Sequence, residues 1–109
     1  MKAILHLLLA FCAIACPAVC NAADPNAAIP RVKEICQACH GMDGNSQVAD
    51  NPKLGGQYPD YLAKALRDYQ SGLRKNPVMA GFVDKLSRQD IENLAAYYAA
   101  QPAVLSTRH

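Results

Sequence analysis

The stretch of sequence that decides the fold is Cys36-Gln37-Ala38-Cys39-His40. Two thiols three residues apart, followed at once by an imidazole, form the C-x-x-C-H pattern of covalent haem attachment. At a helix end, the thiols reach the two vinyl groups of one porphyrin, while Gln37 and Ala38 only set the spacing. The imidazole then lies under the iron as its proximal nitrogen ligand. The pattern predicts one haem c, bound through Cys36 and Cys39 and ligated by His40.

Three other uses of this cysteine pair give a poorer fit. A thioredoxin-like site lies between a strand and a helix of a βαβ unit, and the chain shows no alternating strand pattern of useful length. A structural zinc ion takes four ligands, but after the N-terminal segment only His109 remains as a further His and no further Cys remains. A plain disulfide between Cys36 and Cys39 stays open, although it leaves the adjacent His40 unexplained.

The N-terminal segment has the three-part pattern of a secretory signal peptide. Lys2 is followed by an apolar run over 3–15 and then by small residues up to Ala23. The run is shorter than the ~20 apolar residues that span a bilayer. We therefore expect a signal peptide over 1–23, cleaved after Ala22 or, preferably, after Ala23.

Removal of the signal peptide on export to the periplasm determines which cysteines the mature protein keeps. A lipoprotein signal at Cys16 is the alternative, and it changes the anchoring of the protein but not its chemistry. Cleavage after Ala23 leaves one domain over 24–109 with only two cysteines, which excludes a multi-disulfide scaffold.

The chain has 11 basic and 9 acidic residues and no basic stripe. A nucleic-acid partner is therefore not expected.

Apolar residues at helical spacing predict an all-α fold with three main helices. Pro59 in a first turn and Gly72 after a last turn are typical of helix ends. Ser87, with Asp90 three positions on, resembles a capping box. Two loops are unusually long for such a small domain, and a haem that they enclose explains them. The expected elements are helices over 25–38, 58–71 and from 88 to before Pro102, loops over 41–57 and 73–80, a short helical turn over 82–86, and a tail over 103–109.

A six-coordinate electron carrier needs a second axial ligand, and thioether sulfur favours ferrous iron. Met1 leaves with the signal peptide, and Met42 lies too close to His40 to reach the opposite face of the haem. Met79 stands in the second loop, far enough along the chain to reach that face. We predict that Met79 is the distal ligand. Core filling is the alternative role for Met79, and His109 is a weak competitor because chain ends are poorly held.

Six segments of the chain, taken in their order along the sequence, resemble segments of the class I cytochrome c family. Within the family, the chain is similar to small bacterial single-haem carriers and to one half of tandem two-haem cytochromes. The resemblance covers nearly the whole mature chain and implies the class I fold, with its helices and two long loops enclosing one covalent haem. The segments are 36–41, 51–57, 61–62, 76–79, 86–87 and 94–98.

The resemblance also implies the surroundings of the haem. The backbone carbonyl of Pro52 accepts the second ring N–H of His40, and such contacts usually orient a metal-bound imidazole. Leu54 packs against the haem, and Val78 lies near its distal edge. The family also places its distal ligand at the position of Met79.

Further side chains have two possible roles each. Three side chains either contact the haem propionates or are ordinary solvated surface residues, and these are Arg74, Asn76 and Tyr61. An aromatic residue of the last helix packs across small residues of the first helix in this family, and the residues concerned are Tyr97 or Tyr98 against Ala27, Ala28 or Val32. This packing is a simpler explanation for the tyrosines than an electron path through them.

The expected function is one-electron transfer between redox proteins in the periplasm, without a small-molecule substrate and without enzymatic activity. A haem c subunit of a larger periplasmic oxidoreductase is the alternative, so the chain is expected to be a monomer or a subunit. A haem sensor or a peroxidase-like protein is a third possibility, and it requires Met79 to be absent from the iron. No catalytic triad, paired-carboxylate site or phosphate-binding loop is visible in the sequence.

Overall fold

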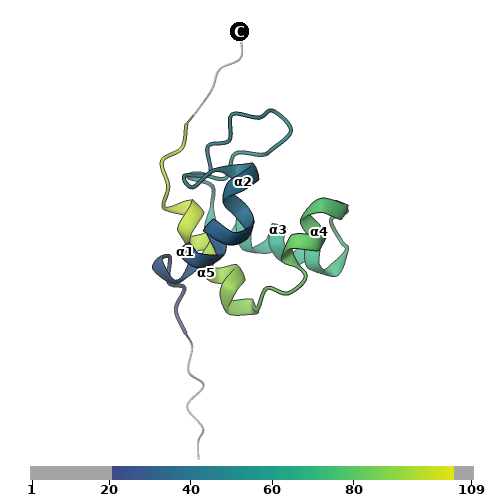
Figure 1. The fold of residues 1–109 in the computed structure, drawn as a ribbon. Helices are drawn as coiled ribbons and strands as arrows, with labels where there is room; N and C mark the ends of the chain where they lie inside the picture. The colour runs from purple at the N-terminus through teal and green to yellow at the C-terminus, as the bar shows by residue number, and fades with distance from the viewer. Residues whose placement is uncertain (1–20, 105–109) are drawn as a thin grey trace, which may run out of the picture.

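The computed structural model describes residues 21–104, and within them the chain is helical with no strand (Figure 1). The predicted signal peptide over 1–23 lies almost wholly outside this range, as do Cys16 and His109. Among the helices of the described part, none has the length and apolar character that a bilayer span requires. The elements are η1 (Asn26–Ala28), α1 (Ile29–Arg31), η2 (Val32–Cys36), α2 (Gln37–His40), α3 (Pro59–Ser71), α4 (Pro77–Val83) and α5 (Arg88–Ala99).

The first four elements form one continuous helical segment, close to the predicted helix over 25–38. Its middle part, η2, is a π-helix, in which the Gln37 backbone N–H donates to the Val32 carbonyl five residues back. The Gln37 side-chain amide donates to the Lys33 carbonyl at 2.8 Å. Gln37 therefore does more than set the spacing of the cysteines, because it supplies a hydrogen-bond donor inside the widened turn. The segment ends at Gly41, whose φ of 80° suits glycine.

Helices α3 and α5 have the ends that the sequence predicts. Helix α3 has Pro59 in its first turn and ends at Gly72 in the left-handed conformation. Helix α5 begins with a complete capping box, in which the Ser87 hydroxyl accepts from the Asp90 backbone N–H and the Asp90 carboxylate accepts from the Ser87 N–H. Local signals in the sequence therefore determine where these two helices begin.

The prediction of a loop over 73–80 is wrong for its second half, because α4 begins at Pro77. The short helical turn expected over 82–86 is also misplaced. The Asn76 side-chain oxygen accepts from the backbone N–H groups of Val78 and Met79, and Pro77 occupies the first helical position. An Asn cap followed by Pro starts a helix. Pro77 thus begins α4, which takes the place of the short helical turn expected over 82–86 and starts five residues earlier.

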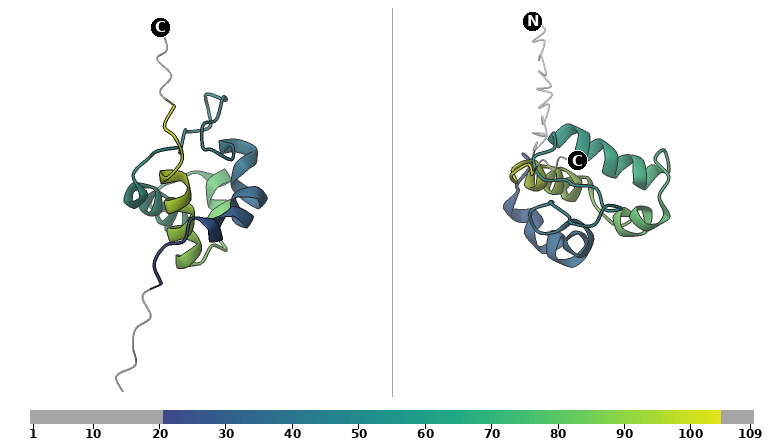
Figure 2. Two further views of the ribbon diagram at one scale, coloured as in Figure 1. Left: turned by 90° about the vertical axis from the view of Figure 1, so that its left-hand side faces the viewer. Right: turned by 90° about the horizontal axis from the view of Figure 1, so that it is seen from above.

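Helix α5 lies between the first helical segment and α3 (Figure 2). Tyr97 and Tyr98 on α5 share one core with Ala28 and Val32 of the first segment, as the resemblance implies, whereas Ala27 is exposed. The buried side chains of this core are Ala28, Val32, Leu62, Ala63, Val83, Leu86, Ile91, Leu94, Ala95, Tyr97 and Tyr98.

Candidate haem site

A cavity of about 410 Å³ opens between α2, α3, α4 and α5. This volume falls in the usual range for sites that hold small molecules and cofactors. Such a site needs apolar walls with a few well-placed polar groups, and the cavity has this character. Its apolar lining includes Ile35, Leu54, Leu62, Leu66, Val78, Phe82, Val83 and Leu94. The predicted contacts Leu54 and Val78 are thus both at the cavity.

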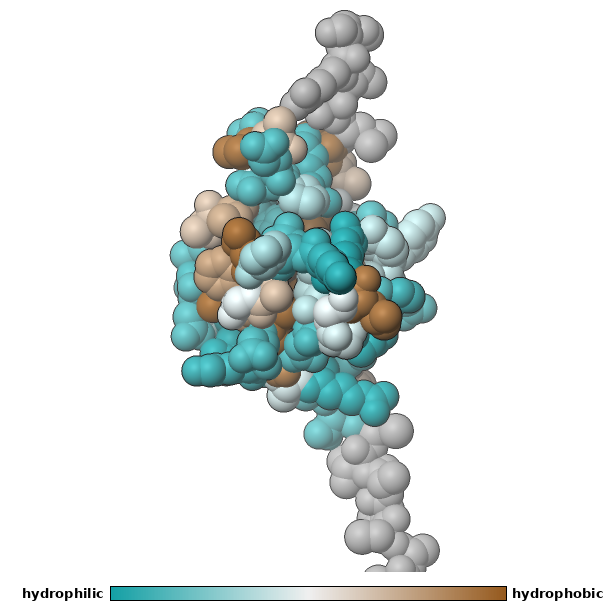
Figure 3. Space-filling model, turned by 90° about the vertical axis from the view of Figure 1, so that its right-hand side faces the viewer, coloured by the Kyte–Doolittle hydropathy of each residue, from teal (hydrophilic) through white to brown (hydrophobic). Residues whose placement is uncertain are grey.

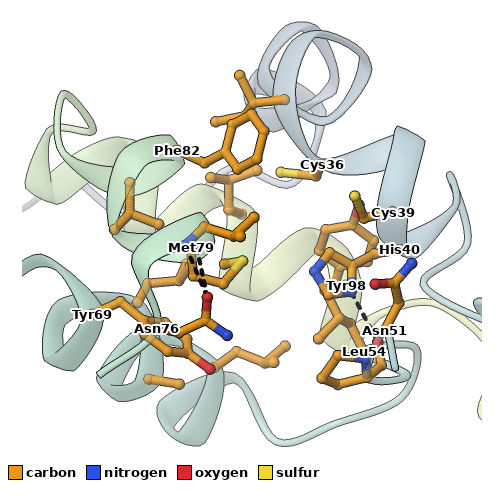
Figure 4. Close-up of a pocket in the computed structure, with 18 of the residues that line it drawn as sticks. Cys36, Cys39, His40, Asn51, Leu54, Tyr69, Asn76, Met79, Phe82 and Tyr98 are labelled. Carbon is orange, nitrogen blue, oxygen red and sulfur yellow. Dashed lines mark hydrogen bonds between the residues drawn. The ribbon is translucent and has the colours of Figure 1, made fainter. Parts of the chain in front are cut away.

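The two cysteines lie together at one end of the cavity, with their sulfur atoms near its rim (Figure 4). Cys36 ends η2 and Cys39 lies on α2, and both are partly buried free thiols. Burial raises the pKa of the Cys36 thiol to about 11, although an interaction with Tyr98 opposes the shift. Redox-active dithiols have lowered pKa values instead. The environment of Cys36 therefore disfavours the redox-dithiol alternative and is compatible with attachment of a porphyrin.

His40 is buried on α2, and its imidazole faces the cavity (Figure 4). The Nδ1 atom lies 2.9 Å from the Pro52 carbonyl oxygen, which is the contact that the resemblance implies. Because a carbonyl only accepts, Nδ1 carries the proton, and the lone pair belongs to Nε2. A metal-binding histidine needs this tautomer, together with a hydrogen bond from the ring nitrogen that does not bind the metal.

Met79 lies on the opposite wall, and its sulfur points across the cavity toward His40 (Figure 4). The residue belongs to α4, and its backbone N–H donates to Asn76 Oδ1 at 3.1 Å. The sequence correctly indicates the opposite wall but wrongly places Met79 in a loop. Met42, in contrast, is more than one-third exposed and does not line the cavity.

The end of the cavity opposite the cysteines is polar. Arg74 lies with its guanidinium carbon 4.9 Å from the centroid of the Tyr69 ring, and its Nη1 donates to the Tyr61 hydroxyl at 3.5 Å. The Tyr61 contact raises the pKa of Arg74, so the cation is favoured here. Arg74, Asn76 and Tyr69 line the cavity, whereas Tyr61 does not. Tyr69 is a lining residue that we did not predict as one, although it follows Leu62 and Leu66 on the apolar stripe of α3.

The donor set of the cavity fits haem c. Two thiols lie at one end, and an imidazole nitrogen and a thioether sulfur face each other from opposite walls. A cation, Arg74, also lines the cavity and stacks on Tyr69. A nitrogen and sulfur pair of this kind is the axial ligand set of many c-type cytochromes. Within residues 21–104, no cluster of three or more His, Cys, Asp or Glu side chains offers a separate metal site.

Comparisons with known proteins agree with this fit. A family model described as "Cytochrome C oxidase, cbb3-type, subunit III" matches residues 24–97. A cytochrome c4 of Thiocapsa roseopersicina is 44% identical over 79 residues, which cover 72% of this chain and 41% of that protein. Cytochrome c-554(548) of Halomonas halodenitrificans is 39% identical over 69 residues, which cover 61% of this chain and 83% of that protein.

The fold also matches a solved structure, that of reduced recombinant cytochrome c4 from Pseudomonas stutzeri. The TM-score is 0.60 at 33% identity, and the match covers 74% of this chain and 51% of the solved chain. The chain thus spans about half the length of the cytochrome c4 proteins that it matches. The match confirms the all-α, class I cytochrome c fold. The chain belongs to this family of cytochrome c domains, whose cofactor is a covalently attached haem c.

Proposed function

We propose that this protein is a one-electron carrier whose haem c is attached through Cys36 and Cys39 and ligated by His40 and Met79. The observation that carries the proposal is the placement of the His40 imidazole and the Met79 sulfur on opposite walls of one apolar cavity (Figure 4). When bound, the haem supplies an iron that cycles between the ferrous and ferric states. Thioether ligation favours the ferrous state and raises the potential.

The protein holds both ligands on regular secondary structure. His40 ends α2 and is oriented by the Pro52 carbonyl, while Met79 lies in the first turns of the capped helix α4. Ligands on fixed elements need little movement when the iron changes its charge, and fast electron exchange benefits from this rigidity. The apolar side chains around the ligands also exclude water. These features support a carrier more than a sensor or a peroxidase, which would leave one position of the iron open.

The setting of the carrier is also part of the proposal. The signal pattern over 1–23 supports export to the periplasm with the domain over 24–109 as the mature protein. Redox proteins are the expected partners. The similarity to cytochrome c4 supports this setting, but the chain matches only about half of that protein.

The surface beside the cavity supports contact with another protein, and the subunit alternative is therefore the second candidate. Leu73, Val78 and Phe82 are 81%, 63% and 46% exposed, although all three are large apolar residues. The face that carries α4 accordingly shows hydrophobic areas among hydrophilic ones (Figure 3). Apolar surface of this kind marks sites of protein contact. A transient redox partner and a permanent complex both fit it.

An absorption spectrum and a haem-stained denaturing gel of the periplasmically expressed protein test the proposal. Haem that stays with the polypeptide, sharp reduced α and β bands and a sulfur-to-ferric charge-transfer band are expected. A Cys39→Ser variant is the control, and it should lose normal two-thioether attachment. Covalent haem without the charge-transfer band would favour the sensor or peroxidase alternative. Absence of covalent haem in a host that matures other c-type cytochromes would overturn the proposal.

The same preparation separates the carrier from the subunit. A haem-stained band that elutes at the mass of the single chain from the periplasm of its own host supports the free carrier. Elution of all the haem-stained chain in one stable complex, resistant to high salt, supports the subunit instead.

A further inference from the structure

Tyr98 on α5 contacts the proximal loop, which we define as residues 41–57, at three separate places. Its hydroxyl donates to the Gly41 carbonyl oxygen at 3.1 Å. Its backbone carbonyl accepts from the Gly56 N–H at 3.0 Å. Its ring lies so close to Gly44 that a Cβ atom there would be 2.8 Å from Cδ1 of Tyr98. The Tyr98 side chain therefore touches the loop at Gly41 and Gly44, and its backbone carbonyl binds the loop near its end, at Gly56.

Tyr98 is itself rigidly placed. It is 3% exposed and belongs to the main core together with Val32 and Leu94. Its ring packs edge to face on Tyr97, with the ring centroids 5.2 Å apart. Burial raises the pKa of Tyr98 above its ordinary value, so the hydroxyl stays protonated and remains a donor at neutral pH. Because the core holds Tyr98 in place, its contacts can in turn hold the proximal loop in place.

The contacts continue from Tyr98 to the imidazole through the loop itself. The Gly44 carbonyl accepts from the backbone N–H groups of Leu54 and Gly55 at 2.7 and 3.2 Å. These bonds hold the segment that follows Pro52, and the Pro52 carbonyl in turn accepts from Nδ1 of His40. Gly41 directly follows His40 in the chain. Tyr98 therefore holds the backbone on both sides of the contact between His40 and Pro52.

We propose that Tyr98 is a positioning residue for His40, which fixes the proximal loop so that the Pro52 carbonyl keeps its hydrogen bond to the imidazole. This inference rests on the proposed role of His40 as the proximal ligand. A hydrogen bond at Nδ1–H makes the imidazole a more basic ligand, and a more basic ligand stabilises ferric iron. Loosening the loop weakens the bond and should raise the reduction potential.

The test compares three variants of the reduced, folded holoprotein. The readouts are the exchange rate of the His40 Nδ1 proton, followed by NMR in the diamagnetic ferrous state, and the reduction potential. Tyr98→Phe removes one hydroxyl and should accelerate this exchange roughly fivefold, as expected for the loss of one neutral hydrogen bond, and raise the potential. Tyr58→Phe makes the same chemical change at a 78% exposed side chain and should change neither readout.

Tyr97→Phe is the control matched for burial. Tyr97 is 9% exposed, and its hydroxyl donates to the Met42 carbonyl at 2.8 Å. It should lower stability by an amount similar to Tyr98→Phe but change the His40 proton less. If Tyr98→Phe lowers stability and leaves both His40 readouts unchanged, or if Tyr97→Phe changes them equally, the proposal for Tyr98 is wrong.

Failure of the proposed function gives a different result. It would appear already in the wild-type protein, as absence of a ring-current-shifted imidazole signal from an iron-bound His40. With that signal present in the wild type, the three variants test only the role of Tyr98.

Discussion

The Nδ1 atom of His40 lies 2.9 Å from the carbonyl oxygen of Pro52, which is twelve residues further along the chain. The contact joins the end of α2 to the far side of the proximal loop and sets the tautomer of the imidazole. Because the acceptor belongs to the backbone, no single side-chain substitution removes it.

Met79→Ala should leave the haem covalently attached but open the iron to carbon monoxide and cyanide, because the cysteines and His40 are unchanged. The reduction potential should also fall, since thioether ligation favours ferrous iron. Absorption spectra with and without carbon monoxide check this. Met42→Ala is the matched control, because Met42 lies outside the cavity. A Met79→Ala spectrum that stays low-spin and unaffected by both ligands would show that another group binds the iron.

Arg74→Gln should lower the reduction potential by tens of millivolts, where about 59 mV is a tenfold change for one electron. A cation near the haem disfavours the additional positive charge of ferric iron, and Arg74 lines the polar end of the cavity. Redox titration checks the shift. Lys75→Gln removes the same charge from the neighbouring exposed residue, which does not line the cavity. Equal shifts in the two variants would indicate a general charge effect, without a specific role for Arg74.

Gly44→Ala should destabilise the holoprotein by about 2–4 kcal/mol. The new Cβ would lie 2.6 Å from the Gly55 nitrogen and 2.8 Å from the Tyr98 ring, and Gly44 has a φ of +72°. Both overpacking and backbone strain contribute. Gly81→Ala makes the same change in open space on α4 and should stabilise by ~0.5–1 kcal/mol. Urea unfolding of both variants measures the difference, and a similar small effect at the two glycines would contradict it.

Asp90→Asn should reduce the pH dependence of stability. The Ser87 backbone N–H lowers the pKa of Asp90 in the folded protein, so the carboxylate stabilises the fold above its ordinary pKa near 4. This contribution is lost as the pH falls through that value and below it. Wild type should therefore exceed Asp90→Asn in the free energy of unfolding at pH 7, by about 0.3–1 kcal/mol, and the difference should be smaller at pH 3. Urea titrations at both pH values check this, and a constant difference would contradict it.

The cofactor and the helices that hold it follow from local sequence signals. The C-x-x-C-H pattern depends on residues that are adjacent in the chain, and the capping box at Ser87 is equally local. The loop expected over 73–80 includes Pro77, which is the first residue of α4. The signal was nevertheless present, since Asn76 before Pro77 is a cap followed by a favourable first position.

Long-range contacts were harder to predict. The hydroxyls of Tyr97 and Tyr98 donate to Met42 and Gly41, which are more than fifty residues earlier in the chain. The family resemblance implies that one of these rings packs on the first helix but does not determine where the two hydroxyls find acceptors. The stacking of Arg74 on Tyr69 depends on how the loop after α3 turns back, and no local pattern indicates that.

The π-helix at Val32–Cys36 also limits how this chain can change in length. It inserts a widened turn between residues that face α5, such as Ala28 and Val32, and the thiols that face the cavity. A π-turn holds one residue more than an α-turn, so removing one residue there would leave an ordinary α-helical turn and keep the core residues and the thiols in their relative orientation. Exchanging the exposed Lys33 or Glu34 for another residue changes neither the number of residues in the turn nor the relative orientation of the two parts of the helical segment. We therefore expect natural variants to differ freely in which residues occupy the exposed positions of this turn, and to differ in length here by the one residue that separates a π-turn from an α-turn.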